Sequence, residues 1–210
     1  MMELGKEDKD LHGNVPDKSG AVLILVDVIN DLDFPDNEYL VRQADGLADR
    51  IVVLKKRCAA ANIPIVYVND NRGKWRSDVQ EVVSQAQRDG APGRSFARKL
   101  APGAADYVVL KPKHSIFFAT PLDLILEHLG VHIVIVAGIT TNACILISAG
   151  ELFVRGFRLV VPSDCVAALT HDLHQKALAL MNDSFKTDTT PSDILELTYF
   201  TSASSAGIAV

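Results

Sequence analysis

Five short apolar runs, separated by longer segments with helical spacing, constrain the fold of this chain more than any other feature. The runs are rich in Val and Ile, have almost no polar alternation, and cover residues 21–26, 63–68, 107–110, 131–137 and 158–162. Such runs are typical of strands that are buried on both faces of a sheet. A sixth, weaker strand is predicted near residues 193–197.

Helical patterns fill most of the intervals between these runs. They cover residues 40–61, 75–87, 121–129, 143–155 and 171–185. Strands that alternate with helices favour right-handed crossovers and a parallel sheet. We therefore expect an α/β fold: a single three-layer domain with a parallel sheet of five to six strands and helices on both faces. The domain should cover residues 20–200, with a flexible N-terminal lead at 1–19 and a loose C-terminal tail at 201–210.

The composition excludes several classes of function. Of the 210 residues, 48% are hydrophobic and 22% are charged, which is ordinary for a globular protein. The net charge is −5 and no run of Lys or Arg forms a basic stripe, so a nucleic-acid partner is not expected. The apolar runs are too short to cross a membrane, and the first twenty residues lack the apolar region of a signal peptide. Three widely spaced cysteines do not form a disulfide pattern, so we expect a cytoplasmic protein; they are Cys58, Cys144 and Cys165.

Three reactive side chains fall at the carboxyl ends of predicted strands, where α/β sheets bind their ligands. Asp27 follows the first strand, Lys111 follows the third, and Cys144 lies in the turn after the fourth, where the next helix should begin. The N–H groups and dipole at a helix start favour a thiolate and can also hold an oxyanion. An acid, a cation and a thiol on one rim are suited to nucleophilic catalysis.

Four blocks of sequence resemble the isochorismatase-like cysteine hydrolase superfamily, in the order that this superfamily requires. They are residues 23–31, 109–117, 138–144 and 156–164. The resemblance implies a Rossmann-like fold and hydrolysis of a C–N bond in a small amide or ureido compound. It also implies a homodimer or homotetramer.

The resemblance assigns a catalytic triad to Asp27, Lys111 and Cys144. In this scheme the thiolate attacks the carbonyl carbon, and Asp27 protonates the leaving amine and then activates the water that hydrolyses the thioester. The backbone N–H groups of Thr140 and Cys144 form the oxyanion hole beside a cis peptide bond between residues 139 and 140. Lys113 has the same chemistry as Lys111, but the spacing to the downstream Ser and Phe of the motif favours Lys111.

Candidate substrate-binding residues are found on the same rim: Phe34, Asn69, Asp70 and Phe117. Core packing for the two aromatic residues, and a plain turn for the other two, are the alternatives. Several basic residues, among them Arg72, suggest a substrate that carries a carboxylate. His114 is expected to be a surface histidine rather than a proton shuttle, and the His171 and His174 pair is a weak metal candidate.

Departures from the superfamily pattern restrict the prediction. Many members have Gln two positions after the catalytic Asp, where this chain has Ile29. Nicotinamidases bind a divalent metal through an Asp and histidines after the first strand, but this chain has no His between His12 and His114. We therefore predict no metal and no cofactor, and nicotinamidase activity is disfavoured.

Two alternative functions remain open. An isochorismatase-type vinyl ether hydrolase would use Asp27 as a general acid and would not need Cys144. A non-catalytic binding relative of the same fold would need no thiol at this position. The presence of Cys144 favours the branch that cleaves C–N bonds.

Overall fold

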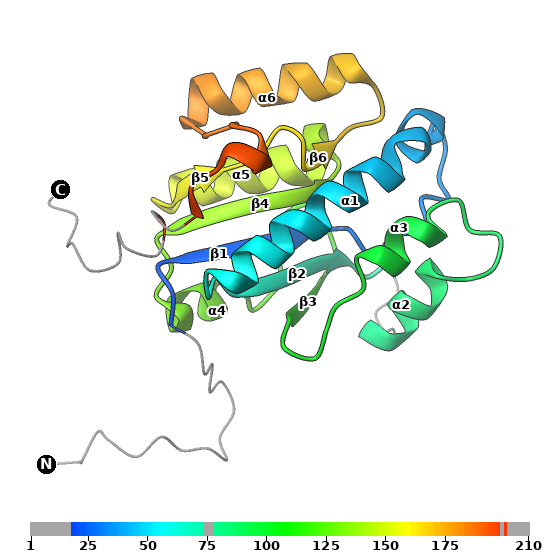
Figure 1. Ribbon diagram of the computed structural model, residues 1–210, viewed down its shortest axis with the longest axis horizontal. Helices are drawn as coiled ribbons and strands as arrows, with labels where there is room; N and C mark the ends of the chain where they lie inside the picture. Colours follow the sequence, from blue (N-terminus) through cyan, green and yellow to red (C-terminus); the bar gives the residue numbers. More distant parts are fainter. Residues whose placement is uncertain (1–17, 74–77, 198–199, 201–210) are drawn as a thin grey trace, which may run out of the picture.

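The computed structural model describes residues 18–73, 78–197 and 200, which form one sheet covered by helices (Figure 1). The strand order is β3-β2-β1-β4-β5, with β6 paired to β4, and every pair is parallel. The strands are β1 (Ala21–Val26), β2 (Ile65–Asp70), β3 (Tyr107–Lys111), β4 (Ile133–Ile139), β5 (Arg158–Val160) and β6 (Val166–Ala167). The predicted α/β fold with a parallel sheet is confirmed.

Helices pack on both faces of this sheet. They are α1 (Glu38–Ala60), α2 (Val79–Ala86), α3 (Arg94–Lys99), α4 (Leu122–Leu129), α5 (Leu146–Val154) and α6 (His171–Phe185). The sheet separates two core clusters. Alternate side chains of β1 belong to different clusters, because successive residues of a strand point to opposite faces. Leu23 and Leu25 belong to the cluster that contains the buried side of α1, which crosses one face of the sheet in Figure 1. Val22 and Ile24 belong to the second cluster, with α4, α5 and α6.

The structure differs from the sequence prediction in short elements. The prediction of a strand near residues 193–197 is wrong, because Ser192–Ile194 forms a single 3₁₀ turn. The sixth strand is β6 instead, which has two residues and pairs with the carboxyl end of β4 beyond β5. A strand of two residues is too short for a hydrophobic pattern to reveal it.

The predicted helix at 143–155 is also divided. A π-helical turn at Thr141–Ile145 precedes α5. Residues 74–77, at the start of the predicted helix 75–87, lie outside the described residues, as do 1–17 and 201–210. The flexible lead and the loose tail therefore stay predictions.

The topology gathers strand ends at one edge of the sheet. From β1 the chain adds β2 and β3 on one side, and it then crosses over to add β4 and β5 on the other. The order therefore reverses between β1 and β4, which is where doubly wound sheets bind ligands. The register places Val26 opposite both Val68 and Gly138, so the carboxyl ends of these three strands lie at the same level.

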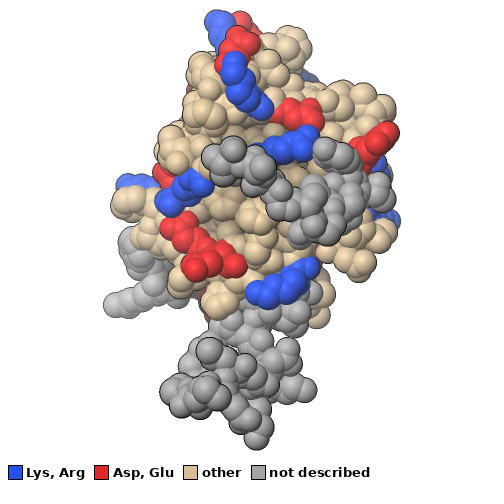
Figure 2. Space-filling view, turned by 90° about the vertical axis from the view of Figure 1, so that its left-hand side faces the viewer, with Lys and Arg blue, Asp and Glu red and all other residues tan. Residues whose placement is uncertain are grey.

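Charged side chains of both signs lie on the surface of the molecule. On the face shown in Figure 2, Lys and Arg side chains lie among Asp and Glu side chains rather than in a patch of one sign. Within the ranges that the structure describes, no helix combines the length and the apolar character needed to span a membrane.

Candidate active site

A buried ion pair between Asp27 and Lys111 lies at the bottom of the site. The Nζ atom of Lys111 lies 2.8 Å from Oδ2 of Asp27 and also donates to the carbonyl oxygen of Lys113 at 3.0 Å. The side chain of Lys111 is 0% exposed. The other carboxylate oxygen of Asp27 accepts the backbone N–H of Asp70 at 2.7 Å. Both oxygens of the carboxylate are thus held in place by the ends of β2 and β3.

The thiol of Cys144 completes the group that the sequence placed on this rim. Its sulfur lies 3.6 Å from Nζ of Lys111 and 3.4 Å from Nδ1 of His114. Asp27, Lys111 and Cys144 are therefore neighbours, although Asp27 and Cys144 are 117 positions apart in the chain. The side chain of Lys113 is exposed, so the cation beside the thiol is Lys111.

The electrostatics of the group differ from the sequence expectation of an easily ionised thiol. Burial raises the pKa of Cys144 to about 12, and the charge of Asp27 acts in the same direction, while Lys111 opposes both. The thiol is therefore protonated in the free protein at neutral pH. The helix start does not produce a thiolate here, because burial and the neighbouring carboxylate together outweigh the favourable charges.

The carboxylate of Asp27 is one base next to this thiol. Burial raises the pKa of Asp27 above its ordinary value of 3.8, against the lowering effects of Lys111, the Cys144 thiol and the Asp70 N–H. Burial alone would lower the pKa of Lys111, but the negative charge of Asp27 raises it above 10.5 overall. Lys111 stays charged, and the pKa of Asp27 is raised. The Asp27 carboxylate can therefore accept a proton from the thiol.

The turn after β4 places Cys144 on the rim. The Ile139–Thr140 peptide bond is cis, as the family resemblance implied. The carbonyl oxygen of Thr140 accepts the N–H groups of Ala143 at 3.1 Å and Ile145 at 3.2 Å, which closes the π-helical turn. Cys144 lies inside this turn, so its position depends on the turn rather than on the following α-helix.

Two side chains that the sequence did not assign to the site hold this turn in place. Nδ1 of His174, on α6, lies 3.0 Å from Oγ1 of Thr141. Ser148, on α5, donates to the carbonyl oxygen of Cys144 at 2.6 Å and accepts the N–H of Ile116 at 3.3 Å. Burial lowers the pKa of His174 below 6.5. The contact between His174 and Thr141 therefore ties the turn to α6.

A cavity of about 400 Å³ opens above Asp27, Lys111 and Cys144. Most of the residues that the sequence proposed for this rim line the cavity: Asp27, Phe34, Asn69, Asp70, Thr140 and Cys144. Phe117 is not among the described residues that line it. Its ring is buried in the core cluster with α4 and α5, and the Arg155 guanidinium lies 4.1 Å from the ring centroid. The structure therefore supports the packing alternative for Phe117.

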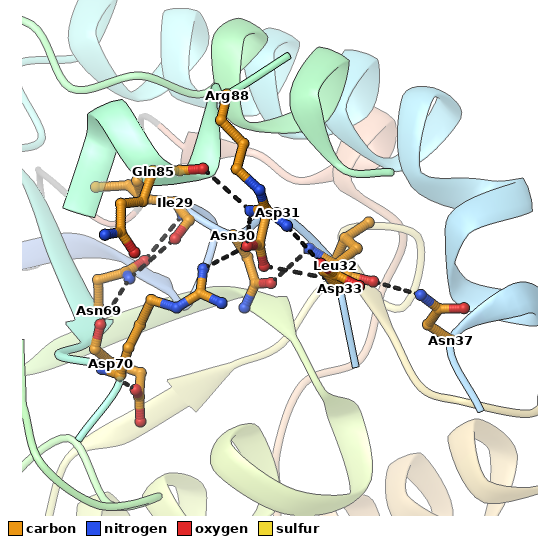
Figure 3. Close-up of polar contacts among 11 residues, drawn as sticks. Ile29, Asn30, Asp31, Leu32, Asp33, Asn37, Asn69, Asp70, Gln85 and Arg88 are labelled. Carbon is orange, nitrogen blue, oxygen red and sulfur yellow. Dashed lines mark hydrogen bonds and ion pairs between the residues drawn. The ribbon is translucent and has the colours of Figure 1, made fainter. Parts of the chain in front are cut away.

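Asn69 lies on the rim but has a clear structural task (Figure 3). Its Oδ1 accepts the N–H of Ile29 at 2.8 Å, and its Nδ2 donates to the carbonyl oxygen of Ile29 at 3.1 Å. The buried amide therefore ties the loop after β1 to the end of β2. Residue 29, where the chain departs from the superfamily pattern, is held through its backbone.

A charged network at the cavity wall was not found by sequence reasoning. Asp31 is 1% exposed, and its carboxylate pairs with Arg72 at 2.6 Å and with Arg88. Arg88 also pairs with Asp33, as Figure 3 shows. The only sequence signal was that Asp31 ends the first family block. Nothing local identifies Arg88, because it lies just after α2, far from Asp31 in the sequence.

We expect Asp31→Asn to destabilise the protein by about 1.5–3 kcal/mol at pH 7, because hydrogen bonds to a charged group are lost. Burial alone would raise the pKa of Asp31, but hydrogen bonds from Arg72 and Arg88 hold it below 3.8. A carboxyl whose pKa is depressed by folding contributes stability above its unfolded pKa and loses it on acidification. The difference from wild type in urea unfolding should therefore shrink as the pH falls below 3.8.

The matched control is Asp89→Asn, because that carboxylate is 91% exposed and pairs with Arg94 on the surface. This variant should change the free energy of unfolding by less than about 0.5 kcal/mol. A difference between wild type and Asp31→Asn that stays constant with pH would contradict the assigned role of the carboxylate.

The described residues contain no group of three or more His, Cys, Asp or Glu side chains arranged to hold a metal ion. His171 and His174 have no third partner of this kind within the part of the chain that the structure describes. The absence of a metal from the reaction stays a prediction.

Comparison with known proteins identifies the family of this chain. The model of the isochorismatase domain matches residues 21–192, which include the whole sheet and every residue of the site described above. The chain belongs to the isochorismatase family. The resemblance inferred from the sequence blocks is thereby confirmed.

Individual known proteins are similar to this chain over different lengths. The family protein YaaI of Bacillus subtilis is 32% identical over 180 residues, which is 85% of this chain and 98% of YaaI. The maleamate amidohydrolase of Pseudomonas putida is 33% identical over 108 residues, 51% of each chain. The crystal structure of an isochorismatase family protein from Desulfovibrio vulgaris has a TM-score of 0.68 at 22% identity, and covers 87% of this chain and 99% of that chain.

Proposed function

We propose that this protein is a cysteine-dependent hydrolase that cleaves the C–N bond of a small amide or ureido compound. The observation that carries the proposal is the meeting of Asp27, Lys111 and Cys144 beneath one cavity of about 400 Å³. Membership of the isochorismatase family supports it, as does similarity to a relative named for amide hydrolysis.

The first half of the proposed reaction forms a thioester. Since the thiol is protonated in the free protein, its proton passes to Asp27 as the sulfur attacks the carbonyl carbon. The N–H groups of Thr140 and Cys144 would hold the oxyanion. Asp27 then gives the proton to the departing nitrogen, the C–N bond breaks, and ammonia or an amine leaves.

The second half releases the acid. Water adds to the thioester carbonyl, the C–S bond breaks, and the thiol is regenerated. Lys111 has a part in both halves, because its charge stabilises the carboxylate of Asp27 and any thiolate at Cys144.

We further propose that the substrate carries a carboxylate. Arg72 lines the cavity, and one of its guanidinium nitrogens is fixed by Asp31 at 2.6 Å. An arginine has five N–H donors in a planar fork, so the remaining donors suit a carboxylate. The small volume of the cavity agrees with a substrate of metabolite size.

The experiment is to measure ammonia release from a panel of small amides and ureido acids, with wild type and Cys144→Ala side by side. Turnover should be found for at least one carboxylate-bearing compound and should fall to background in Cys144→Ala. Cys58→Ala is the matched control, because this thiol lies on the buried face of α1 and does not line the cavity. Comparable ammonia release by Cys144→Ala would refute the proposed mechanism.

Isochorismate belongs in the same panel. Activity on this vinyl ether that persists in Cys144→Ala would support the alternative in which Asp27 acts alone as a general acid. A homodimer or homotetramer and a cytoplasmic location remain predictions.

A further inference from the structure

The Cys144 sulfur has two basic neighbours, and they lie in different environments. Asp27 is 5% exposed, and its two oxygens are engaged by Lys111 and by the backbone of Asp70. His114 follows β3, has an exposed side chain, lines the cavity, and places Nδ1 3.4 Å from the sulfur. One base therefore approaches the sulfur from the protein interior and the other from the open side of the cavity.

The two half-reactions make different demands on these bases. While the thioester forms, the proton travels only from the sulfur to the nitrogen that leaves, inside an occupied cavity. Once the amine has left, water enters through the open side and needs a base close to the carbon that is bonded to sulfur. Nδ1 of His114 satisfies this requirement, because an atom within hydrogen-bond reach of the sulfur also lies near its acyl carbon.

We propose that His114 is a further catalytic residue, the general base of thioester hydrolysis, and that Asp27 acts as base in thioester formation. The proposal rests on the proposed function and divides between two residues the work that the family resemblance gave to Asp27 alone. Unprotonated Nδ1 takes one proton from the attacking water while the water oxygen bonds to the acyl carbon. As the C–S bond breaks, the imidazolium returns this proton to the sulfur, and the acid product leaves.

The contact between His114 and Cys144 is tested without any substrate. Because proton transfer through it is reversible, Nδ1 also takes the thiol proton as the sulfur attacks iodoacetamide, and so speeds alkylation of Cys144. His114→Ala should lower this rate severalfold at neutral pH, and imidazole added to the solution should restore it. An unchanged or faster rate would show that His114 merely covers the sulfur and would overturn the proposal.

His132→Ala is the matched control for this measurement. His132 is also an exposed histidine, but it precedes β4, at the opposite edge of the sheet from the cavity. The alkylation rate of Cys144 should be unchanged in this variant, with or without imidazole.

The hydrolytic role is tested with a compound that the wild type turns over. Loss of a general base should lower kcat about 100-fold in His114→Ala, with the acylated Cys144 accumulating in the intact mass spectrum and imidazole accelerating its decay. Asp27→Asn should accumulate no acyl-enzyme, because its defect lies in the first half-reaction. Slow turnover by His114→Ala without an acyl-enzyme would overturn the assignment.

Failure of the proposed function has a separate signature. If the wild type releases no ammonia from any compound in the panel, the amidohydrolase assignment falls, and the hydrolytic role of His114 falls with it. The alkylation experiment still decides whether Nδ1 exchanges a proton with the Cys144 sulfur.

Discussion

Replacing Lys111 by methionine is expected to abolish turnover and to lower the free energy of unfolding by about 3–5 kcal/mol, as is usual when one partner of a buried ion pair is removed. The side chain of Lys111 is 0% exposed and that of Asp27 is 7% exposed, so water cannot replace the lost ammonium. The carboxylate would be left buried without its counter-charge. The variant would thus lack both the ion pair that holds Asp27 as proton acceptor for the thiol and the cation that stabilises a thiolate.

Lys113→Met is the matched control, because it removes the same charge from an exposed side chain two residues away. It should change neither ammonia release nor urea unfolding by more than the ordinary effect of a surface substitution, about 0.5 kcal/mol. Equal effects of the two substitutions would contradict the assignment of Lys111 to the ion pair.

A double variant separates the stability effect of Lys111 from its effect on catalysis. Combining Lys111→Met with Asp27→Asn removes both buried charges, so it should recover much of the stability lost in Lys111→Met alone. Turnover should stay at background, because neither the base nor the cation is present. Unfolding curves and ammonia release measured on the same preparations would show whether the two effects separate in this way.

Gly138→Ala is expected to lower the free energy of unfolding by at least about 3 kcal/mol, or to prevent folding altogether. A Cβ atom at this position would lie 2.0 Å from the carbonyl oxygen of Val26, and the backbone has a φ of 126°, which side chains rarely adopt. Val26 and Gly138 are paired in the sheet, so neither strand can move away without breaking the register. Any folded fraction should also have lost activity, because Asp27 and the Cys144 turn directly follow these two residues.

Gly46→Ala is the control for this substitution. Gly46 lies inside α1, and the nearest atom to an added Cβ is in the flexible side chain of Arg50, at 3.5 Å. Here the substitution should stabilise the protein by about 0.5–1 kcal/mol, because alanine favours a helix interior over glycine. Thermal or urea unfolding of both variants would test the contrast. Similar effects would show that the close approach of β1 and β4 is not what makes Gly138 necessary.

The sequence predicted the elements whose signals are local. β1 has the predicted bounds, because six consecutive buried residues form a hydrophobic run between Gly20 and Asp27. α6 also has its predicted bounds, because Thr170 caps it by accepting the N–H of Leu173 at 3.1 Å. The predicted strand near residues 193–197 was wrong and the two-residue β6 was missed, since pairing at the edge of a sheet depends on neighbours rather than on the segment itself.

The sequence by itself also determined that the candidate catalytic side chains share one rim of the sheet. In a parallel sheet the carboxyl ends of the strands share one edge, so Asp27, Lys111 and the Cys144 turn had to lie on the same rim once their strands were recognised. The order of the family blocks was enough to indicate the family, which the match over residues 21–192 confirms.

Only the tertiary structure decided how these residues interact. Lys111 rather than Lys113 faces the thiol because β3 ends at residue 111, after which strand alternation no longer fixes which way a side chain points. The packing of Phe117 and the contact of His114 with the sulfur depend on that same irregular segment. The protonation state of Cys144 depends on burial and on the charge of Asp27, and both arise only when strands distant in sequence pack together.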